Sequence, residues 1–316
     1  MATVKENAVY NNNSLIEKLG AVQQFVGNTP LFPITKLHRN PKVKIFAKME
    51  WQQLGMSVKT RPAFNIIKQA ILVGKLDTER NLLDASSGNT GVAYAAIGAA
   101  LGIPVTLCIP ENTSLQKKYA LKFYGAKLIE TSKFDSTDGS QEKAKQLFAE
   151  NPDKYYYADQ YNNNNNWKAH YNTTGEEIFS QTEKQITHFI AGLGTTGTFT
   201  GTSRKLKELN SNIKVISLQP DFALHGLEGW KHMETAKVPG IYDTQLADEN
   251  REVGTGDAYD MIVKMAKLEG VLLSPSSAAN VVGAVKLANE IEEGVIVTVF
   301  PDHGSNYQEV LNELIR

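Results

Sequence analysis

The sequence predicts an α/β protein whose sheets are largely parallel and covered by helices on both faces. Short apolar runs rich in β-branched residues alternate with amphipathic helical stretches, which is the pattern of strand–helix–strand units. Turns of small residues join several strands to the next helix. With 316 residues, 41% hydrophobic and 21% charged, the chain can form one large or two intimately packed domains.

Strands are expected wherever apolar and β-branched residues form short runs. In chain order these runs are 43–49, 82–85, 105–109, 127–130, 155–158, 188–191, 214–218 and 295–300. Cys108, the only cysteine, lies in the run at 105–109. We therefore expect an inert core thiol and neither a disulfide nor a CxxC site.

Helices are expected between the strands, at 62–72, 91–101, 115–123, 141–149, 198–209, 258–268 and 278–291. Pro62 suits the first turn of its helix, and Ser57 or Thr60 could cap it. The five consecutive asparagines at 162–166 are expected in a polar surface loop. No flexible linker marks a domain boundary, and no internal repeat is present.

Composition excludes several classes of protein. The net charge of −1 gives no indication of nucleic acid or of an anionic membrane as partner. Residues 1–7 lack the apolar stretch of a signal peptide, and no apolar run is long enough to span a bilayer. A cytoplasmic protein is therefore expected.

Four loops could carry chemistry. The first reads Ser57-Val58-Lys59-Thr60-Arg61-Pro62 and places two cations at a helix N-terminus, which already carries partial positive charge. A lysine there is easier to deprotonate, and Schiff-base formation requires a neutral amine. Two solvated basic side chains are the alternative.

The second loop reads Ser86-Ser87-Gly88-Asn89-Thr90-Gly91 and joins a strand to an alanine-rich helix. Small residues at such a turn leave backbone N–H groups pointing outward, which makes an anion site suited to a substrate carboxylate. A tight turn with a helix cap is the alternative.

The third loop follows another strand and reads Gly192-Leu193-Gly194-Thr195-Thr196-Gly197-Thr198. Its glycines permit close backbone approach, and its threonine hydroxyls favour a phosphate monoester. No Lys-Ser/Thr follows the last glycine, so a nucleoside-triphosphate P-loop is excluded. The run also matches GxGxxG, and Asp221 follows the next strand, so an NAD-dependent dehydrogenase remains an alternative.

The fourth loop opens a helix and reads Ser274-Pro275-Ser276-Ser277-Ala278. A serine hydroxyl aimed at a ring nitrogen leaves that nitrogen unprotonated, whereas an aspartate would hold a proton on it. A simple helix cap is the alternative.

Together and in this order, the four loops resemble the B-type cysteine synthases (O-acetylserine/O-phosphoserine sulfhydrylases) of the fold-type II, tryptophan-synthase-β-like enzymes. These enzymes use pyridoxal 5'-phosphate (PLP). The similarity runs from Gly27-Asn28-Thr29-Pro30-Leu31 to Phe300-Pro301-Asp302-His303-Gly304-Ser305-Asn306-Tyr307. It implies two three-layer α/β domains: a smaller, mobile one of residues 43–152 with the substrate-carboxylate loop, and a larger one of residues 1–42 plus 153–316 with the phosphate loop.

The resemblance also implies residue roles. Lys59 would form an imine with PLP and act as the catalytic base. Asn89 would contact the ring hydroxyl and Ser276 the pyridine nitrogen, while the phosphate would be held by Gly194, Thr195, Thr196, Gly197 and Thr198. The substrate carboxylate would be held by Ser86, Ser87, Gly88, Thr90 and Gln160, and no metal is expected.

The implied activity is β-replacement by a transferase of cysteine biosynthesis. An activated serine, O-acetylserine or O-phosphoserine, would react with sulfide or another thiol through an α-aminoacrylate to give cysteine. A lyase that eliminates from serine, threonine or cysteine, and a diverged non-catalytic PLP-binding relative, remain alternatives. A homodimer is expected, with a serine acetyltransferase or a sulfur-carrier protein as candidate partners.

Departures from the family pattern lie next to the expected cofactor site. Relatives usually read Asn-Pro-x-Gly-Ser before the lysine and Asp after it, whereas this chain has Gln53-Leu54-Gly55-Met56-Ser57 and Thr60. The usual Gly-Ile-Ser-Ser-Gly is here Ser274-Pro275-Ser276-Ser277-Ala278. Met56 and Ala278 add bulk, so substrate preference and full activity stay open.

Lys231 stands near the position where phosphoserine-using relatives carry an arginine. We expect it to steady an acidic leaving group or a second anionic substrate. A solvated surface lysine is the alternative.

Overall fold

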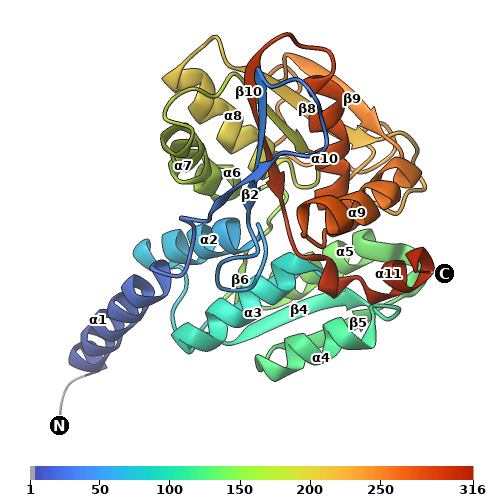
Figure 1. The fold of residues 1–316 in the computed structure, drawn as a ribbon. Helices are drawn as coiled ribbons and strands as arrows, with labels where there is room; N and C mark the ends of the chain where they lie inside the picture. Colours follow the sequence, from blue (N-terminus) through green and yellow to red (C-terminus); the bar gives the residue numbers. More distant parts are fainter. Residues whose placement is uncertain (1–3, 316) are drawn as a thin grey trace. The chain divides into compact units, whose positions relative to one another are not determined.

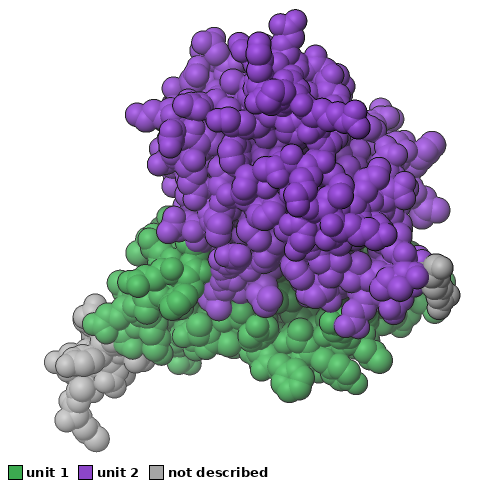
Figure 2. All heavy atoms as spheres, viewed as in Figure 1, with its two compact units in different colours: residues 1–26, 59–165 green, residues 27–58, 166–316 purple. Residues whose placement is uncertain are grey.

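The computed structural model describes residues 4–315, with backbone alone at 4–13 and 136, and it divides into two compact units (Figures 1 and 2). Unit 1 comprises Met1–Val26 and Lys59–Asn165, and unit 2 comprises Gly27–Val58 and Asn166–Arg316. Residue 316 and residues 1–3, which begin the segment in which no signal peptide was expected, lie outside the described residues.

Unit 1 contains a four-stranded, wholly parallel sheet in the order β5-β4-β3-β6. Its strands are β3 (Asn81–Ala85), β4 (Val105–Pro110), β5 (Lys127–Thr131) and β6 (Tyr155–Tyr157). Its helices are α1 (Val4–Gln23), α2 (Thr60–Leu72), α3 (Asn89–Leu101), α4 (Leu115–Phe123) and α5 (Ser136–Glu150), and Lys133–Asp135 form a 3₁₀ turn.

The two faces of this sheet are covered by different helices. Successive side chains of a strand point to opposite faces. Cys108 accordingly joins the core cluster that includes Ala144 of α5, while Leu107 faces Gly91 of α3. Burial raises the pKa of the Cys108 thiol to about 11. The cysteine is thus a buried core thiol, as expected.

Unit 2 contains a six-stranded sheet in the order β1-β2-β10-β7-β8-β9, in which only the β1–β2 pair is antiparallel. The strands are β1 (Leu31–Ile34), β2 (Val43–Met49), β7 (His188–Gly192), β8 (Lys214–Pro220), β9 (Glu249–Val253) and β10 (Gly294–Phe300). The helices are α6 (Asn164–Asn172), α7 (Thr174–Gln181), α8 (Gly197–Leu209), α9 (Thr255–Glu269), α10 (Pro275–Ala288) and α11 (Gln308–Leu314), with a 3₁₀ turn at Gly304–Asn306.

Alternate residues of each central strand feed two separate cores. Ile190, Ile216 and Ile296 pack with residues of α9 and α10. Phe189 and Val215 pack instead with residues of α7 and α8. The sheet of unit 2 is therefore buried on both faces, which explains why its strands read as continuous apolar runs.

Parallel pairing places several loops of unit 2 at one edge of its sheet. Strands β2, β10, β7 and β8 run in the same direction, so their carboxyl ends share that edge. The segments that follow them are residues 50–58, 301–303, 193–196 and 221–226. Ligand sites of open α/β sheets lie at this edge.

The observed elements confirm the α/β class and every predicted strand. Helices at 62–72 and 141–149 begin earlier than expected, at Thr60 and Ser136, and the helix expected at 278–291 spans Pro275–Ala288. The sequence pattern missed α1, β1, α6, α7, β9 and α11. Strand β9 reads Glu-Asn-Arg-Glu-Val and lies at a sheet edge, where burial imposes no apolar pattern.

The asparagine run is a loop only in its first part. Residues 162 and 163 precede α6, whereas Asn164, Asn165 and Asn166 form its first turn. The expected polar surface loop is wrong for Asn166, which is 1% exposed. Amide side chains favour helix starts as well as turns, and composition does not distinguish the two.

The observed units differ from the expected division at residues 43 and 152. Strand β2 pairs with β10 and so belongs to the sheet of unit 2. Strand β6 pairs with β3 and so belongs to unit 1.

Between residues 4 and 315, no helix combines the length and apolar character that crossing a membrane demands.

Candidate functional site

The serine loop (residues 86–90) connects β3 to α3 in unit 1. The Gly91 N–H donates to the Ser86 hydroxyl at 3.0 Å, which closes the turn. A Cβ at Gly91 would lie 2.4 Å from the Ser86 carbonyl oxygen, so only glycine permits this close approach. Ser87, Gly88 and Asn89 lie half-buried at the tip of the loop. Backbone N–H groups at the start of a helix can bind a carboxylate.

Gln160 is anchored to this loop from another part of unit 1. The Thr90 hydroxyl donates to Gln160 Oε1 at 2.7 Å, and Gln160 Nε2 donates to the Ala85 carbonyl at 3.4 Å. Gln160 is 3% exposed. The fold thus brings together Ser86, Thr90 and Gln160, three of the residues predicted to hold a substrate carboxylate.

The threonine loop (residues 194–198) connects β7 to α8 in unit 2. A Cβ at Gly194 would lie 2.1 Å from the Gly229 carbonyl oxygen, and a Cβ at Gly197 would lie 1.9 Å from Asn166 Oδ1. Both glycines are therefore required by close packing. Thr195 and Thr196 are buried.

Thr196 occupies a strained position at the start of α8. Its φ of 70° is left-handed, which is costly for a β-branched residue. Within residues 4–315 its buried hydroxyl has no hydrogen-bond partner. An unpaired buried hydroxyl costs free energy, and the N-terminus of α8 adds partial positive charge. Both features fit a bound phosphate group, which accepts many hydrogen bonds.

Helix α6 supports the threonine loop from behind. Asn166 Nδ2 donates to the Thr195 hydroxyl at 3.3 Å. His170 Nε2 lies 3.3 Å from the Thr198 hydroxyl, and its Nδ1 lies 2.9 Å from the Thr174 hydroxyl. Sequence reasoning missed both residues, because the asparagine run suggested a loop and an isolated histidine carries no motif.

A second segment of unit 2 flanks the threonine loop. The Lys231 N–H donates to the Leu193 carbonyl at 2.8 Å, and the Trp230 ring occupies the space where Gly192 would carry a Cβ. Lys231 is half-buried. Its backbone is thus fixed beside the loop, and it is not a fully solvated surface residue.

Ser276 lies in the first turn of α10. Ser274 is the N-cap of this helix, and its hydroxyl accepts the Ser277 N–H at 3.2 Å. The Ser276 hydroxyl is 3.3 Å from that of Ser274, and the Ser277 hydroxyl donates to the Asp302 carbonyl at 2.9 Å. The predicted cap is therefore Ser274, while Ser276 is one step inside the helix.

Lys59 directly precedes α2 and is its N-cap residue. The interpretation that Ser57 or Thr60 caps this helix is wrong, since Ser57 forms a bridge with Asp302 and Thr60 is already helical. The Val58 N–H donates to the Pro301 carbonyl at 2.8 Å. The chain that leads into Lys59 is therefore held by the segment that follows β10.

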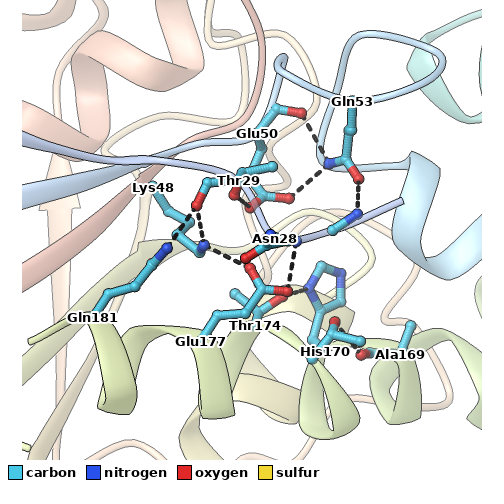
Figure 3. Close-up of polar contacts among 12 residues, drawn as sticks. Asn28, Thr29, Lys48, Glu50, Gln53, Ala169, His170, Thr174, Glu177 and Gln181 are labelled. Atoms are coloured by element: carbon cyan, nitrogen blue, oxygen red, sulfur yellow. Dashed lines mark hydrogen bonds and ion pairs between the residues drawn. The ribbon is translucent and has the colours of Figure 1, made fainter. Parts of the chain in front are cut away.

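A polar network around Gln53 also holds residues 50–58, the segment that leads into Lys59, and Figure 3 shows part of this network. Gln53 Nε2 donates to the Ser57 carbonyl at 3.1 Å and to Glu50 Oε2 at 2.9 Å, while Gln53 Oε1 accepts the Gly27 N–H. The longer side chain of Gln53, where relatives have asparagine, is thus fully engaged. It joins the segment of residues 50–58 to Gly27 within unit 2.

The network continues to a buried ion pair. Lys48 Nζ lies 2.6 Å from Glu177 and donates to the Thr29 carbonyl at 2.5 Å, and the Thr29 hydroxyl donates to Glu50 at 2.8 Å (Figure 3). The Asn28 N–H also donates to Glu177. The Gly-Asn-Thr-Pro-Leu motif therefore organises the loop before Lys59.

Each unit thus gathers part of the predicted site. Unit 1 holds the serine loop with Gln160, and Lys59 at the start of α2. Unit 2 holds the threonine loop with the Lys231 segment, and the α10 N-terminus with Asp302. Asp84 in β3 adjoins the serine loop and was not singled out from the sequence. Its signal in the sequence is that it is the one acidic residue of a largely apolar strand. Among the described residues, no cluster of side chains has the composition of a metal site.

Comparisons with known proteins show to which family the chain is similar. The family model of the pyridoxal-phosphate dependent enzymes matches residues 22–302. Cysteine synthase of Aquifex aeolicus is 45% identical over 293 residues, covering 90% of each chain, and cysteine synthase B of Escherichia coli is 34% identical over 291 residues, covering 92% of this chain and 94% of its own.

Solved structures agree as well. The crystal structure of cysteine synthase from Entamoeba histolytica has a TM-score of 0.86 and 30% sequence identity, and the match covers 93% of this chain and 94% of that one. The dinucleotide interpretation of the glycine run finds no support in these matches. The chain therefore belongs to the pyridoxal-phosphate dependent enzymes of fold type II and, within them, to the cysteine synthase family.

Proposed function

We propose that this chain is a PLP-dependent cysteine synthase. It replaces the β-substituent of an activated serine, O-acetylserine or O-phosphoserine, with sulfide or another thiol. The observation that carries the proposal is the threonine loop, whose buried Thr196 hydroxyl is unpaired within the described part of the chain and points to a phosphate-bearing cofactor. The 45% identity to a cysteine synthase supports the same activity.

The residues have distinct tasks in this proposal. Gly194, Thr195, Thr196, Gly197 and Thr198 hold the PLP phosphate, Asn89 contacts the ring hydroxyl, and Ser276 faces the pyridine nitrogen. When bound, PLP supplies an electron sink for the Cα carbanion of the substrate. Ser86, Ser87, Gly88, Thr90 and Gln160 hold the substrate carboxylate, which orients the Cα–H bond.

Lys59 carries the proton in this scheme. Its ε-amine would hold the cofactor through the aldehyde while no substrate is bound. It then accepts the Cα proton as the general base, the acetate or phosphate leaves the β-carbon, and a thiolate adds there. Lys59 finally returns the proton to Cα, so protons and charge balance over the cycle.

A spectroscopic experiment tests the proposal. The purified protein should be yellow, borohydride should fix the cofactor on Lys59, and cysteine should form from O-acetylserine and sulfide. Lys59→Ala should lose cofactor attachment and turnover. A colourless protein that PLP cannot reconstitute would overturn the proposal. A yellow protein that releases sulfide from cysteine but forms no cysteine from O-acetylserine would indicate a lyase. A yellow protein that turns over none of these substrates would indicate a non-catalytic relative.

We further propose that Lys231 steadies an acidic leaving group or a second anionic substrate. Its backbone hydrogen bond to Leu193 keeps it beside the threonine loop. Lys231→Ala should reduce kcat/KM for O-phosphoserine about tenfold more than for O-acetylserine, since one charge-assisted contact is lost. Equal losses on both substrates, or none, would end this idea.

The remaining assignments concern the cell and its other proteins. We propose a cytoplasmic homodimer that binds a serine acetyltransferase or a sulfur-carrier protein. Light scattering of the purified protein should give twice the mass of 34.8 kDa. A single-chain mass would contradict the dimer.

A further inference from the structure

Asp84 is a buried acid at the carboxyl end of β3 for which the proposed chemistry has no task. It is 1% exposed, and it immediately precedes Ala85 and the serine loop. Its Oδ1 accepts the Ala85 N–H at 2.8 Å, and its Oδ2 accepts the Gln160 N–H at 3.3 Å. One carboxylate therefore joins the two segments that carry the predicted substrate-binding residues.

The segment that carries Gln160 needs this support. The chain leaves β6 through Asp159, whose φ of 43° is left-handed, and the strand ends with the Ala158 N–H donating to Leu83. Gln160 then enters the interior, where its N–H must be paired. Asp84 supplies that acceptor. The Gln160 side chain is in turn fixed by Thr90 and Ala85.

The surroundings of Asp84 disfavour its charge. Burial is the main cause that raises its pKa, to about 7, and nearby Asp159 adds to the effect, while the N–H groups of Ala85 and Gln160 lower it. The other ionisable groups that interact with Asp84 are Tyr94 of α3, Cys108 of β4, Tyr156 and Tyr157 of β6, and Tyr161. None of these is a cation, so the carboxylate is stabilised by the N–H groups of Ala85 and Gln160 and, more weakly, by the Tyr94 hydroxyl, which also lowers the pKa of Asp84.

We propose that Asp84 is a positioning residue whose ionised carboxylate holds Gln160 against the serine loop and so sets the affinity for the amino-acid substrate. The weaker contact, that of Oδ2 with the Gln160 N–H, is the one that protonation would weaken. Acid pH therefore loosens Gln160 while the helix start at Gly91 remains closed by Ser86. This inference rests on the proposed function, because it assigns a role to the residues that bind the substrate carboxylate.

The test is the ratio of KM for O-acetylserine between Asp84→Asn and wild type, measured on holoenzyme from pH 6 to 8.5. In the variant an amide NH₂ replaces one acceptor oxygen and cannot ionise. The ratio should be near unity at pH 6 and rise to about tenfold at pH 8.5, the effect of one charge-assisted hydrogen bond. Titration of the substrate amine cancels in this ratio, and the visible spectrum of the holoenzyme should not change.

Asp77→Asn is the matched control. Asp77 also accepts two backbone N–H groups, from Glu79 and Arg80 at 2.9 and 2.8 Å, but it is exposed in the turn before β3. The ratio of KM between Asp77→Asn and wild type should not change from pH 6 to 8.5. Asp84→Glu, which keeps an ionisable carboxylate, should recover part of the affinity at pH 8.5 and serves if Asp84→Asn does not fold. A ratio independent of pH, or a loss of kcat alone, would overturn the inference, whereas absent wild-type turnover would refute the proposed function instead.

Discussion

Gly55 and Met56, which lie shortly before Lys59, adopt consecutive left-handed backbone conformations, with φ of 77° and 53°. Glycine adopts this conformation without cost, but a side chain with a Cβ does not. Met56 is 58% exposed, so its side chain gains little from burial. Met56 was expected to add bulk near the cofactor. What the structure shows instead is a strained backbone conformation at an exposed position.

Met56→Gly should consequently leave the protein as stable as wild type or raise its free energy of unfolding by up to about 1 kcal/mol. Relief of the left-handed strain offsets the backbone entropy that glycine adds. Urea denaturation measures the change. The control is Gln52→Gly, an exposed neighbour outside the left-handed region, which should lose about 0.5–1 kcal/mol. Equal losses in both variants would contradict the strain argument.

Among the elements, the junction of β7 and α8 depends on contacts with helix α6. Gly197 fits against Asn166 of α6, and His170 of the same helix reaches Thr198. The loop chemistry was readable from glycine and threonine content. The contacts by which α6 supports this loop could not be read from the sequence, because α6 and α8 are separated by another helix and a strand along the chain.

Gly197→Ala should weaken PLP binding at least about tenfold, because its Cβ would lie 1.9 Å from Asn166 Oδ1 and displace the loop. Fluorescence titration of the apoprotein with PLP measures the affinity. Gly20→Ala in α1 is the control, since a Cβ there meets nothing within 4 Å. That variant should bind PLP normally and gain about 0.5–1 kcal/mol of stability. Unchanged PLP affinity in Gly197→Ala would contradict the assignment of this loop.

For the whole molecule, Asp84 links pH to the free energy of unfolding. Its pKa is raised from 3.8 to about 7, so the native state retains a proton that the unfolded chain releases. This contribution to stability is fully present below pH 3.8 and is lost as pH rises through about 7. The residue that orders the substrate site therefore destabilises the native state at alkaline pH.

Asp84→Asn should remove this decline, since asparagine does not titrate. The difference in unfolding free energy, variant minus wild type, should increase between pH 5 and pH 8.5 by up to roughly 3 kcal/mol, the share of the full shift that falls in this range. Urea denaturation at a series of pH values gives the difference directly. Asp77→Asn should show a difference that does not change with pH over this range. A difference that is constant for Asp84→Asn would show that the carboxyl ionises normally.

The sequence by itself determined the α/β class, eight of the ten strands in the described part of the chain, and the four loops at strand or helix ends. These features arise from interactions between near neighbours, namely strand and helix periodicity and the turn chemistry of glycine, serine and proline. Only the tertiary structure decided the pairing of β2 with β10, the burial of Asn166, and the contact of Asp84 with Gln160 across 76 positions. Those outcomes depend on which distant segments share a buried space, and no local pattern records that.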